Sequence, residues 1–426
     1  MNIPAVTKFG NYVFADCPKL TTAVYDANAT STGQYTFQNC TSLTSVTLPT
    51  NITELSTGLF QGCSSLKGVQ IPSGVKKIQS NAFTNCSSLE TIELPSSLTE
   101  IVANLFKGCA ALKSVSIPAS VTKIGNAAFS GCTSLTSLEL PASITTIPNG
   151  MIENCTGIKS ITIPESVTTI NTNAFKGSGI TSFTFPSKVT VINSSVFANC
   201  ADLKSITIPG TIKTINSSAF EGSGLESIYV PDQITSLPMW TFRNCTKLVS
   251  VDMPGVTTLS GQSLFEGCTS LKTVNMPKVK TMSALYLFKG CSSLESITIP
   301  EGVTSLPNQG FVDCSSLKDV KLPSTLTSLP TWAFQNCTSL KSITIPAKVT
   351  SYGSGTFNGC TALIEVIIEN PTPSSIAKGV FPFATNEELV IYVPDASLEA
   401  YKEHASWSVD EYKGRIFGIS TRETAD

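Results

Sequence analysis

The cysteines of this 426-residue chain recur at one fixed spacing. There are 14, and successive cysteines lie 23 residues apart except across two gaps of 45. Each gap divides into 23 and 22 residues, with Ser178 and Ser223 at the missing positions. We call all of these the marker positions, residues 17, 40, 63, 86, 109, 132, 155, 178, 200, 223, 245, 268, 291, 314, 337 and 360. A period between about 20 and 50 residues indicates a solenoid of stacked repeats, which outweighs a domain count based on length.

Other positions keep the same period, and we number them relative to the marker residue. Position −3 holds Phe in 15 of 16 repeats, with Ile152 as the exception, and position +3 is typically Leu. Aliphatic residues follow at +6 and +8, and Pro at about +9. Position −1 is always Gly, Asn or Asp, which tolerate a positive φ. Each repeat is predicted to contain a short strand closed by Pro, an extended aliphatic stretch, and a short helical turn carrying the Phe.

This pattern resembles the leucine-rich repeat of the BspA-like type, which is found on surface proteins of anaerobic bacteria and some protozoa. The resemblance covers about residues 3–369. It implies a repeat solenoid, a right-handed coil or horseshoe of about 16 repeats of 22–23 residues. A parallel β-sheet is expected on one face, short helical turns on the other side, and an α/β cap at the C-terminal end.

The cysteines allow three interpretations. Metal binding is disfavoured, because the ligands of one ion must converge and a ladder spaced by whole repeats does not. Stacked coils about 5 Å apart permit disulfides, but Cys200 has Ser on both sides and no neighbour to pair with. The third interpretation is that each is a buried thiol that bonds a backbone carbonyl weakly. It predicts 14 titratable thiols in denaturant without reductant.

The two ends of the chain differ from its middle. Residues 1–369 are predicted to form the solenoid, and residues 370–426 a degenerate last repeat with a capping helix and strand. Asp395 is expected to N-cap a helix that runs to about His404, and residues 415–419 to form a return strand. The N-terminus begins within a coil, so we expect a truncated end or one on which another domain or chain docks.

Composition argues against most chemistry. Only 14% of residues are charged and the formal net charge is −2, whereas nucleic-acid binders are basic. No apolar run is long enough to span a membrane, so no membrane insertion is expected. There is a single histidine, and the chain lacks nucleotide-binding and nucleophile motifs. We therefore expect no catalytic residue, no metal and no cofactor, and a function that lies on the outward positions of the coils.

The first candidate surface is the outer face of the predicted sheet. Positions +5 and +7 are mostly hydroxyl residues: Ser45, Thr47, Ser114, Ser116, Ser160, Thr162, Ser205, Thr207, Ser296, Thr298, Ser342 and Thr344. Exceptions include Glu93, Glu139, Tyr229, Asp252 and Lys321, which we single out as candidate ligand-binding residues. Such a face suits a protein or glycan partner, but Ser and Thr are also ordinary solvent-facing strand residues.

The second candidate surface lies at position −5. Usually small or polar, this position holds Trp240, Tyr286 and Trp332 at intervals of two repeats, and also Tyr12 and Tyr35. Aromatic side chains here are able to stack on sugars or anchor an interface. Alternatively, the rings lie flat over a neighbouring coil.

The resemblance implies a non-enzymatic, extracellular or cell-surface adhesion module that binds a partner on a host, matrix or microbial surface. One alternative is a carbohydrate-binding accessory protein of a surface glycan-capture system. Another is a structural repeat of a larger fibre or phage-tail assembly.

Overall fold

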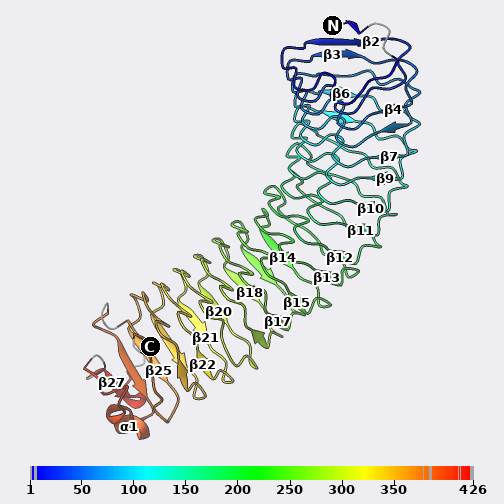
Figure 1. Cartoon of the computed structure of the whole chain (residues 1–426). Coiled ribbons are helices and arrows are strands. Elements are labelled where there is room, and N and C mark those ends of the chain that lie inside the picture. Colours follow the sequence, from blue (N-terminus) through cyan, green and yellow to red (C-terminus); the bar gives the residue numbers. More distant parts are fainter. Residues whose placement is uncertain are drawn as a thin grey trace. The chain divides into compact units, whose positions relative to one another are not determined.

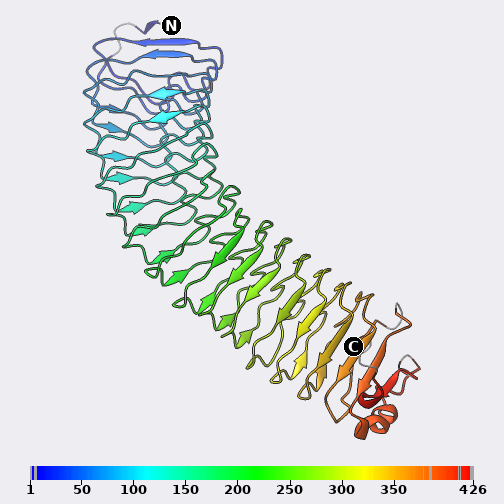
Figure 2. The ribbon, with the colours of Figure 1, turned by 180° about the vertical axis from the view of Figure 1, so that it is seen from behind.

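The computed structural model of the protein describes residues 2–3, 7–377, 379–382, 386–410, 412 and 414–422. It is a parallel β-solenoid of about 17 turns with little helix, which confirms the predicted fold class. The chain divides into two compact units, residues 1–214 and residues 215–426, and each is considered by itself. In both units successive coils lie side by side, with their strands stacked in rows (Figures 1 and 2).

The first row contains the strands predicted around positions +5 to +8, and we call them the face strands. In the first unit they are β1 (Asn2–Ile3), β2 (Thr22–Tyr25), β3 (Ser45–Thr47), β6 (Thr91–Ile92) and β8 (Ser114–Val115). In the second unit they are β14 (Ser227–Tyr229), β16 (Ser250–Asp252), β18 (Thr273–Asn275), β20 (Ser296–Thr298), β21 (Asp319–Lys321), β23 (Ser342–Ile345), β25 (Glu365–Ile368), β26 (Val390–Val393) and β27 (Ile416–Gly418). Paired face strands are parallel, as in β14, β16 and β18.

A second row comes from the aliphatic stretch after the Pro, which was predicted only as extended chain. It consists of two-residue strands: β4 (Glu54–Leu55), β5 (Lys77–Ile78), β7 (Glu100–Ile101), β9 (Lys123–Ile124), β10 (Thr146–Ile147), β11 (Thr169–Ile170), β12 (Val191–Ile192), β13 (Thr214–Ile215), β15 (Ser236–Leu237), β17 (Thr258–Leu259), β19 (Thr281–Met282), β22 (Ser328–Leu329) and β24 (Ser351–Tyr352). Their first residues are mostly exposed and their second residues buried, so each coil closes around one core.

The expected helical turn is a pair of β-turns. Cys245 N–H donates to the Phe242 carbonyl at 3.2 Å, which closes one of them. The N–H groups of Trp240 and Phe242 donate instead to Gln262 and Leu264 of the next coil, at 3.0 and 3.1 Å. Positions −5 and −1 have a positive φ in all 16 repeats. Left-handed residues four positions apart stop a right-handed helix from propagating, so each turn bonds to its neighbouring coil.

The core is formed by residues that meet their own counterparts in the next coil. Phe265 is fully buried and stacks between Phe242 and Phe288, with ring centroids 5.6 and 5.3 Å apart. The same stacking runs from Phe14 to Phe129 in the first unit. The aliphatic residues of both rows of strands are buried too. The core therefore repeats from coil to coil with the same period as the sequence.

The C-terminal segment continues the sheet and adds helix. Between β26 and β27 lie η1 (Asp395–Ser397) and α1 (Leu398–Glu403), and η2 (Ile419–Thr421) follows β27. The helix and return strand are thus found, but the predicted N-cap is wrong. No side chain caps either η1 or α1; the Asp395 carboxylate accepts hydrogen bonds from Ser420 N (3.3 Å) and Oγ (2.7 Å) instead. Asp395 therefore tethers the chain after β27.

The predicted boundary between residues 369 and 370 stays a prediction. The face strands on its two sides, β25 and β26, pair directly in parallel. At the other end, β1 pairs with β2. Residues 4–6, on which the expectation of an incomplete first coil depends in part, lie outside the described residues.

Candidate binding surfaces

The outer sheet face is built by strict alternation. In β20, for example, Ser296 and Thr298 are exposed while Ile297 between them is buried. All twelve predicted hydroxyl residues are exposed, and none of them forms a side-chain hydrogen bond with the described part of the chain. The hydroxyl groups are therefore available to water or to a partner.

The structure brings some of the predicted exceptions together and leaves others apart. Tyr229 on β14, 51% exposed, lies in register with half-buried Asp252 on β16, which in turn faces Asn275 on β18. Asn275, which the sequence reasoning missed, donates from Nδ2 to Asp252 Oδ1 at 2.8 Å. Glu93 and Glu139 are exposed in the first unit and belong to different, non-adjacent coils.

Lys321 lines an acidic hollow of about 420 Å³ beside β21 and β23. The carboxylates of Glu301, Asp319 and Glu369 line the same hollow. Glu301 is held by Ser324, whose backbone N–H and hydroxyl donate to its two oxygens at 3.0 and 2.9 Å. These bonds lower the pKa of the Glu301 carboxyl below its usual value. Among the residues that line the hollow, three carboxylates outnumber one ammonium group, which favours a positively charged ligand group.

A second hollow, of about 550 Å³, lies in the first unit. Glu139 lines it together with the hydroxyl residues Ser137, Ser160 and Thr162. It shows the same composition as the rest of the face, with one carboxylate among hydroxyl groups.

The aromatic residues at position −5 adopt an unusual backbone conformation. Trp240, Tyr286 and Trp332 have φ values of 60°, 61° and 53°. The Trp332 ring lies over Gly355, where a Cβ atom would come within 2.4 Å of its Cδ1. Although it is 41% exposed, Trp332 thus packs on the next coil. This agrees with the alternative interpretation given above, in which the rings lie over a neighbouring coil. Tyr286 lies beneath the Lys289 ammonium, 4.8 Å from the ring centroid.

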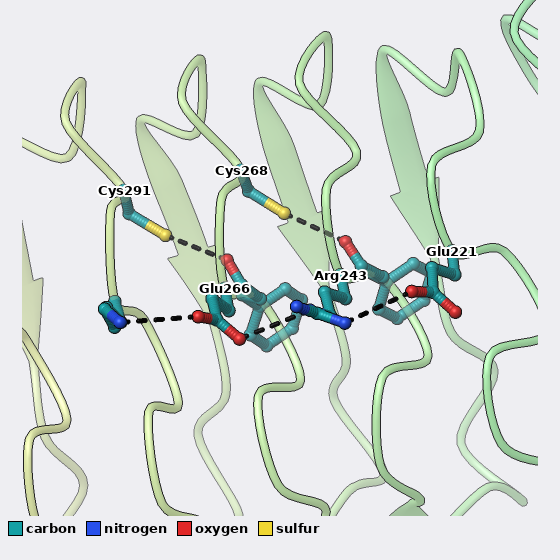
Figure 3. A network of polar contacts seen from close by, with 8 residues as sticks. Glu221, Arg243, Glu266, Cys268 and Cys291 are labelled. Atoms are coloured by element: carbon teal, nitrogen blue, oxygen red, sulfur yellow. Dashed lines mark hydrogen bonds and ion pairs between the residues drawn. The ribbon is translucent and has the colours of Figure 1, made fainter. Parts of the chain in front are cut away.

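A ladder of charges at position −2 was not predicted. Arg243 Nη1 lies 3.6 Å from Glu221 Oε1, and its Nε lies 3.3 Å from Glu266 Oε2. Lys289 Nζ then lies 3.6 Å from Glu266 Oε1. Figure 3 shows Glu221, Arg243 and Glu266 directed toward one another from successive coils, beside the thiols of Cys268 and Cys291. The sequence feature that indicates this ladder is the alternation of Glu, Arg, Glu and Lys at position −2 of successive repeats.

The cysteines are free thiols, and all but half-exposed Cys17 are buried. Cys268 Sγ donates to the Phe242 carbonyl of the preceding coil at 3.0 Å. Twelve further cysteines make the equivalent bond, at 3.0–3.2 Å. The predicted thiol-to-carbonyl bond is confirmed. Burial raises the pKa of Cys109 to about 12, so its thiolate form is scarce at neutral pH.

Among the described residues, no cluster of three or more His, Cys, Asp or Glu side chains is suited to a metal ion. Nor does this part of the chain contain a helix with the length and apolar character needed to cross a membrane.

Comparison with known families explains the repeat. The model of the BspA type leucine-rich repeat region matches residues 1–90, 57–181, 168–284 and 281–401. The chain belongs to this family. BspA-type proteins are usually found at the cell surface, and their repeats and fold are typically non-enzymatic. No curated protein matches the chain significantly.

Solved structures of bacterial leucine-rich repeat proteins are similar to this chain. A leucine-rich repeat protein from Bacteroides ovatus is 27% identical, with a TM-score of 0.58, over 83% of this chain and 87% of that one. A leucine-rich cell surface protein from Faecalibacterium prausnitzii is 26% identical, with a TM-score of 0.42, over 86% of each chain. The first likeness supports the coil architecture of this BspA-type chain.

Proposed function

We propose that this BspA-type chain is a non-enzymatic protein-interaction module on a bacterial cell surface. Its partner is a protein of a host, matrix or microbial surface, bound by the Ser- and Thr-rich outer sheet face. The observation that carries the proposal is the set of exposed hydroxyl residues on this face whose side chains form no hydrogen bond with the residues that the structure describes. Hydroxyl groups donate and accept hydrogen bonds, so many weak contacts sum along the face.

The acidic hollow beside Lys321 gives this face a preferred contact. Glu301, Asp319 and Glu369 place three carboxylates at its walls, and Ser324 holds the carboxylate of Glu301 in its ionised form. A Lys or Arg side chain of the partner fits this charge distribution. We therefore expect partners with an exposed basic segment to bind best.

The test uses the full chain in biolayer interferometry against purified matrix and host-surface proteins. Once a partner is found, Ser296→Arg with Ser342→Arg covers the sheet face with two long side chains. Binding is expected to weaken at least about tenfold, because the substitutions block a contact without touching the core. The matched control, Gln335→Arg with Asn358→Arg, places the same residues on the turn side and is expected to bind normally.

Two results would contradict the proposal. One is a partner whose binding is insensitive to the sheet-face substitutions but is lost with the turn-side ones. The other is antibody labelling of intact cells that detects the chain only after lysis, since a surface module must be accessible from outside.

A further inference from the structure

Three neighbouring strands of the second unit carry a cluster that differs from the rest of the face. Asp252 and Asn275 stand at position +7, and Tyr229 stands at +6 of a coil that is one residue shorter. The three residues lie in direct register on β14, β16 and β18. In the coils that follow, the same position holds Thr298, Lys321, Thr344 and Ile367, so a ring, a carboxylate and an amide in succession occur only on these three of the strands compared. Strands lie about 4.8 Å apart, so an aromatic ring, a carboxylate and an amide occupy consecutive places on one flat surface.

The polar groups of this cluster are fixed but only partly used. Asn275 donates one amide hydrogen to Asp252 Oδ1, at 2.8 Å. Its second amide hydrogen, its own carbonyl oxygen and the other carboxylate oxygen of Asp252 point to no described partner. The first residues of the same three strands, also in register, add hydroxyl groups: Ser227, Ser250 and Thr273. The cluster therefore offers donors and acceptors side by side in one orientation.

Tyr229 supplies the apolar part. Half of its surface is exposed, so a ligand is able to pack against the ring. A sugar ring has a face of C–H groups and a rim of neighbouring hydroxyls. The C–H face matches the Tyr229 ring, and the hydroxyl rim matches Asp252 and Asn275. We propose that β14, β16 and β18 form a subsite for a neutral sugar of a glycan chain.

The local charge selects against acidic sugars. The ionisable side chains on these three strands, and on the residues immediately before them, are Glu226, Asp252 and Lys272. Their sum is negative, and no Arg lies among them to pair with a carboxylate or sulfate. Sialylated or sulfated glycans would meet the Asp252 carboxylate with like charge. A neutral hexose chain is the class that this chemistry accepts.

The experiment measures binding of the full chain to short neutral oligosaccharides of glucose, galactose, mannose or xylose, and to sialylated and sulfated ones, by array and calorimetry. A neutral oligosaccharide is expected to bind in a saturable manner. Tyr229→Ala should weaken it at least about tenfold, from loss of stacking, while Tyr229→Phe keeps it within a few-fold. Asp252→Ala should weaken it about tenfold or more, because a charged hydrogen-bond acceptor is lost.

Controls separate this site from the other surfaces. Thr344→Ala lies on the same face over another coil, and Trp240→Ala with Trp332→Ala removes the aromatic residues of the turn side. All are expected to bind the sugar normally. Sugar binding lost with the Trp pair but not with Tyr229, preference for acidic glycans, or no neutral glycan bound at all would overturn the inference. The proposed protein partner is tested separately, since capture of that partner by Tyr229→Ala is expected to persist.

Discussion

The repeated coils and the C-terminal segment, residues 386–422, bury aromatic side chains in different ways. In the coils a residue meets its own counterpart one period away, as Phe265 meets Phe242 and Phe288. In the C-terminal segment Trp407 packs instead on the unrelated Tyr401 and Tyr412, with centroids 5.2 and 5.6 Å away. Its Nε1 donates to the Ser374 carbonyl at 2.8 Å.

The two regions differ in whether a contact in one place predicts a contact in another. Within the coils, any contact is made many times, so its strength is multiplied and natural variants at other coils show what it tolerates. In the C-terminal segment each contact occurs once. The bond between Tyr401 Oη and the Asn370 carbonyl, at 2.8 Å, has no counterpart to compare with. The predictions below test this contrast.

The largest expected effect is unfolding of the coils at alkaline pH. Burial raises the pKa of ten thiols of the ladder, for example Cys245 to about 11 and Cys109 to about 12. In the unfolded chain a thiol ionises near pH 8.5. Each thiol therefore has a higher pKa in the folded chain than in the unfolded chain. The stability that the protonated thiol contributes is fully present below about pH 8.5 and is lost as the pH rises toward the folded-state pKa. The loss is roughly 1.4 kcal/mol per pH unit for each thiol, and therefore on the order of 10 kcal/mol per pH unit for the ten thiols together.

Circular dichroism between neutral pH and about pH 11 measures this transition, and we expect it to be steep. Residues 386–422 contain no cysteine, so the contribution of the thiols belongs to the coils. Replacing Cys245, Cys268 and Cys291 by Ser removes three of the ionising groups and should move the midpoint upward. A midpoint that stays where it was would contradict the role given to the thiols.

The next effect comes from opening the Phe stack. Phe265→Ala removes a fully buried ring from between two others and is expected to cost about 3–5 kcal/mol of unfolding free energy, measured by urea denaturation. Phe265→Ile should cost clearly less, because Ile152 fills this position in another coil and is fully buried there. Trp407→Ile has no such precedent, and we expect it to cost nearly as much as Trp407→Ala. Equal losses for Phe265→Ile and Phe265→Ala would break the comparison.

How much the sequence predicts follows from the same contrast. The period correctly predicted the thiol bond to a carbonyl, the left-handed residue at −1 and the exposed hydroxyl residues. It marked the recurring Phe, but the stacking of the Phe rings was not predicted. Position −5 is also left-handed but was not recognised, because Tyr, Trp, Ala and Gln occur there beside Gly and Asn. Its φ is imposed by hydrogen bonds to the next coil, such as Trp240 N to Gln262 O, and residue type does not reveal it.

The candidate sites were only partly predictable for a related reason. Tyr229 and Asp252 were singled out as exceptions to the hydroxyl pattern. Asn275 departs from the same pattern but was not singled out, because its importance comes from the bond to Asp252. Asp395 likewise looked like a helix cap, and its tie to Ser420 depends on a tertiary contact that occurs once. Side-chain contacts between different positions require the folded geometry.

A smaller effect tests the turn at position −1. In the coil of Gly108 a Cβ would lie 2.3 Å from Asn85 Oδ1, whereas at Gly131 the nearest atoms, those of Gly108, are 3.5 Å away. Both glycines have a positive φ, 75° and 77°. Gly131→Ala is thus expected to cost about 1–2 kcal/mol from backbone strain alone, and Gly108→Ala about 1 kcal/mol more. The double variant Asn85→Gly with Gly108→Ala removes the clash and should recover that difference; additive effects would contradict the pairing.

The smallest effect is expected at the marker position itself. Ser178 and Ser223 occupy it naturally and are buried, with Oγ 3.6 and 3.4 Å from Cys200 and Cys245 Sγ. Cys268→Ser keeps a donor for the Phe242 carbonyl at nearly the same volume, so thermal unfolding should show a loss below about 1 kcal/mol. Cys268→Val fills the pocket but removes the donor and adds a methyl group, and about 1–3 kcal/mol is expected. If Val were tolerated as well as Ser, volume alone would govern the ladder, and the bond from each thiol to the preceding coil would contribute nothing measurable.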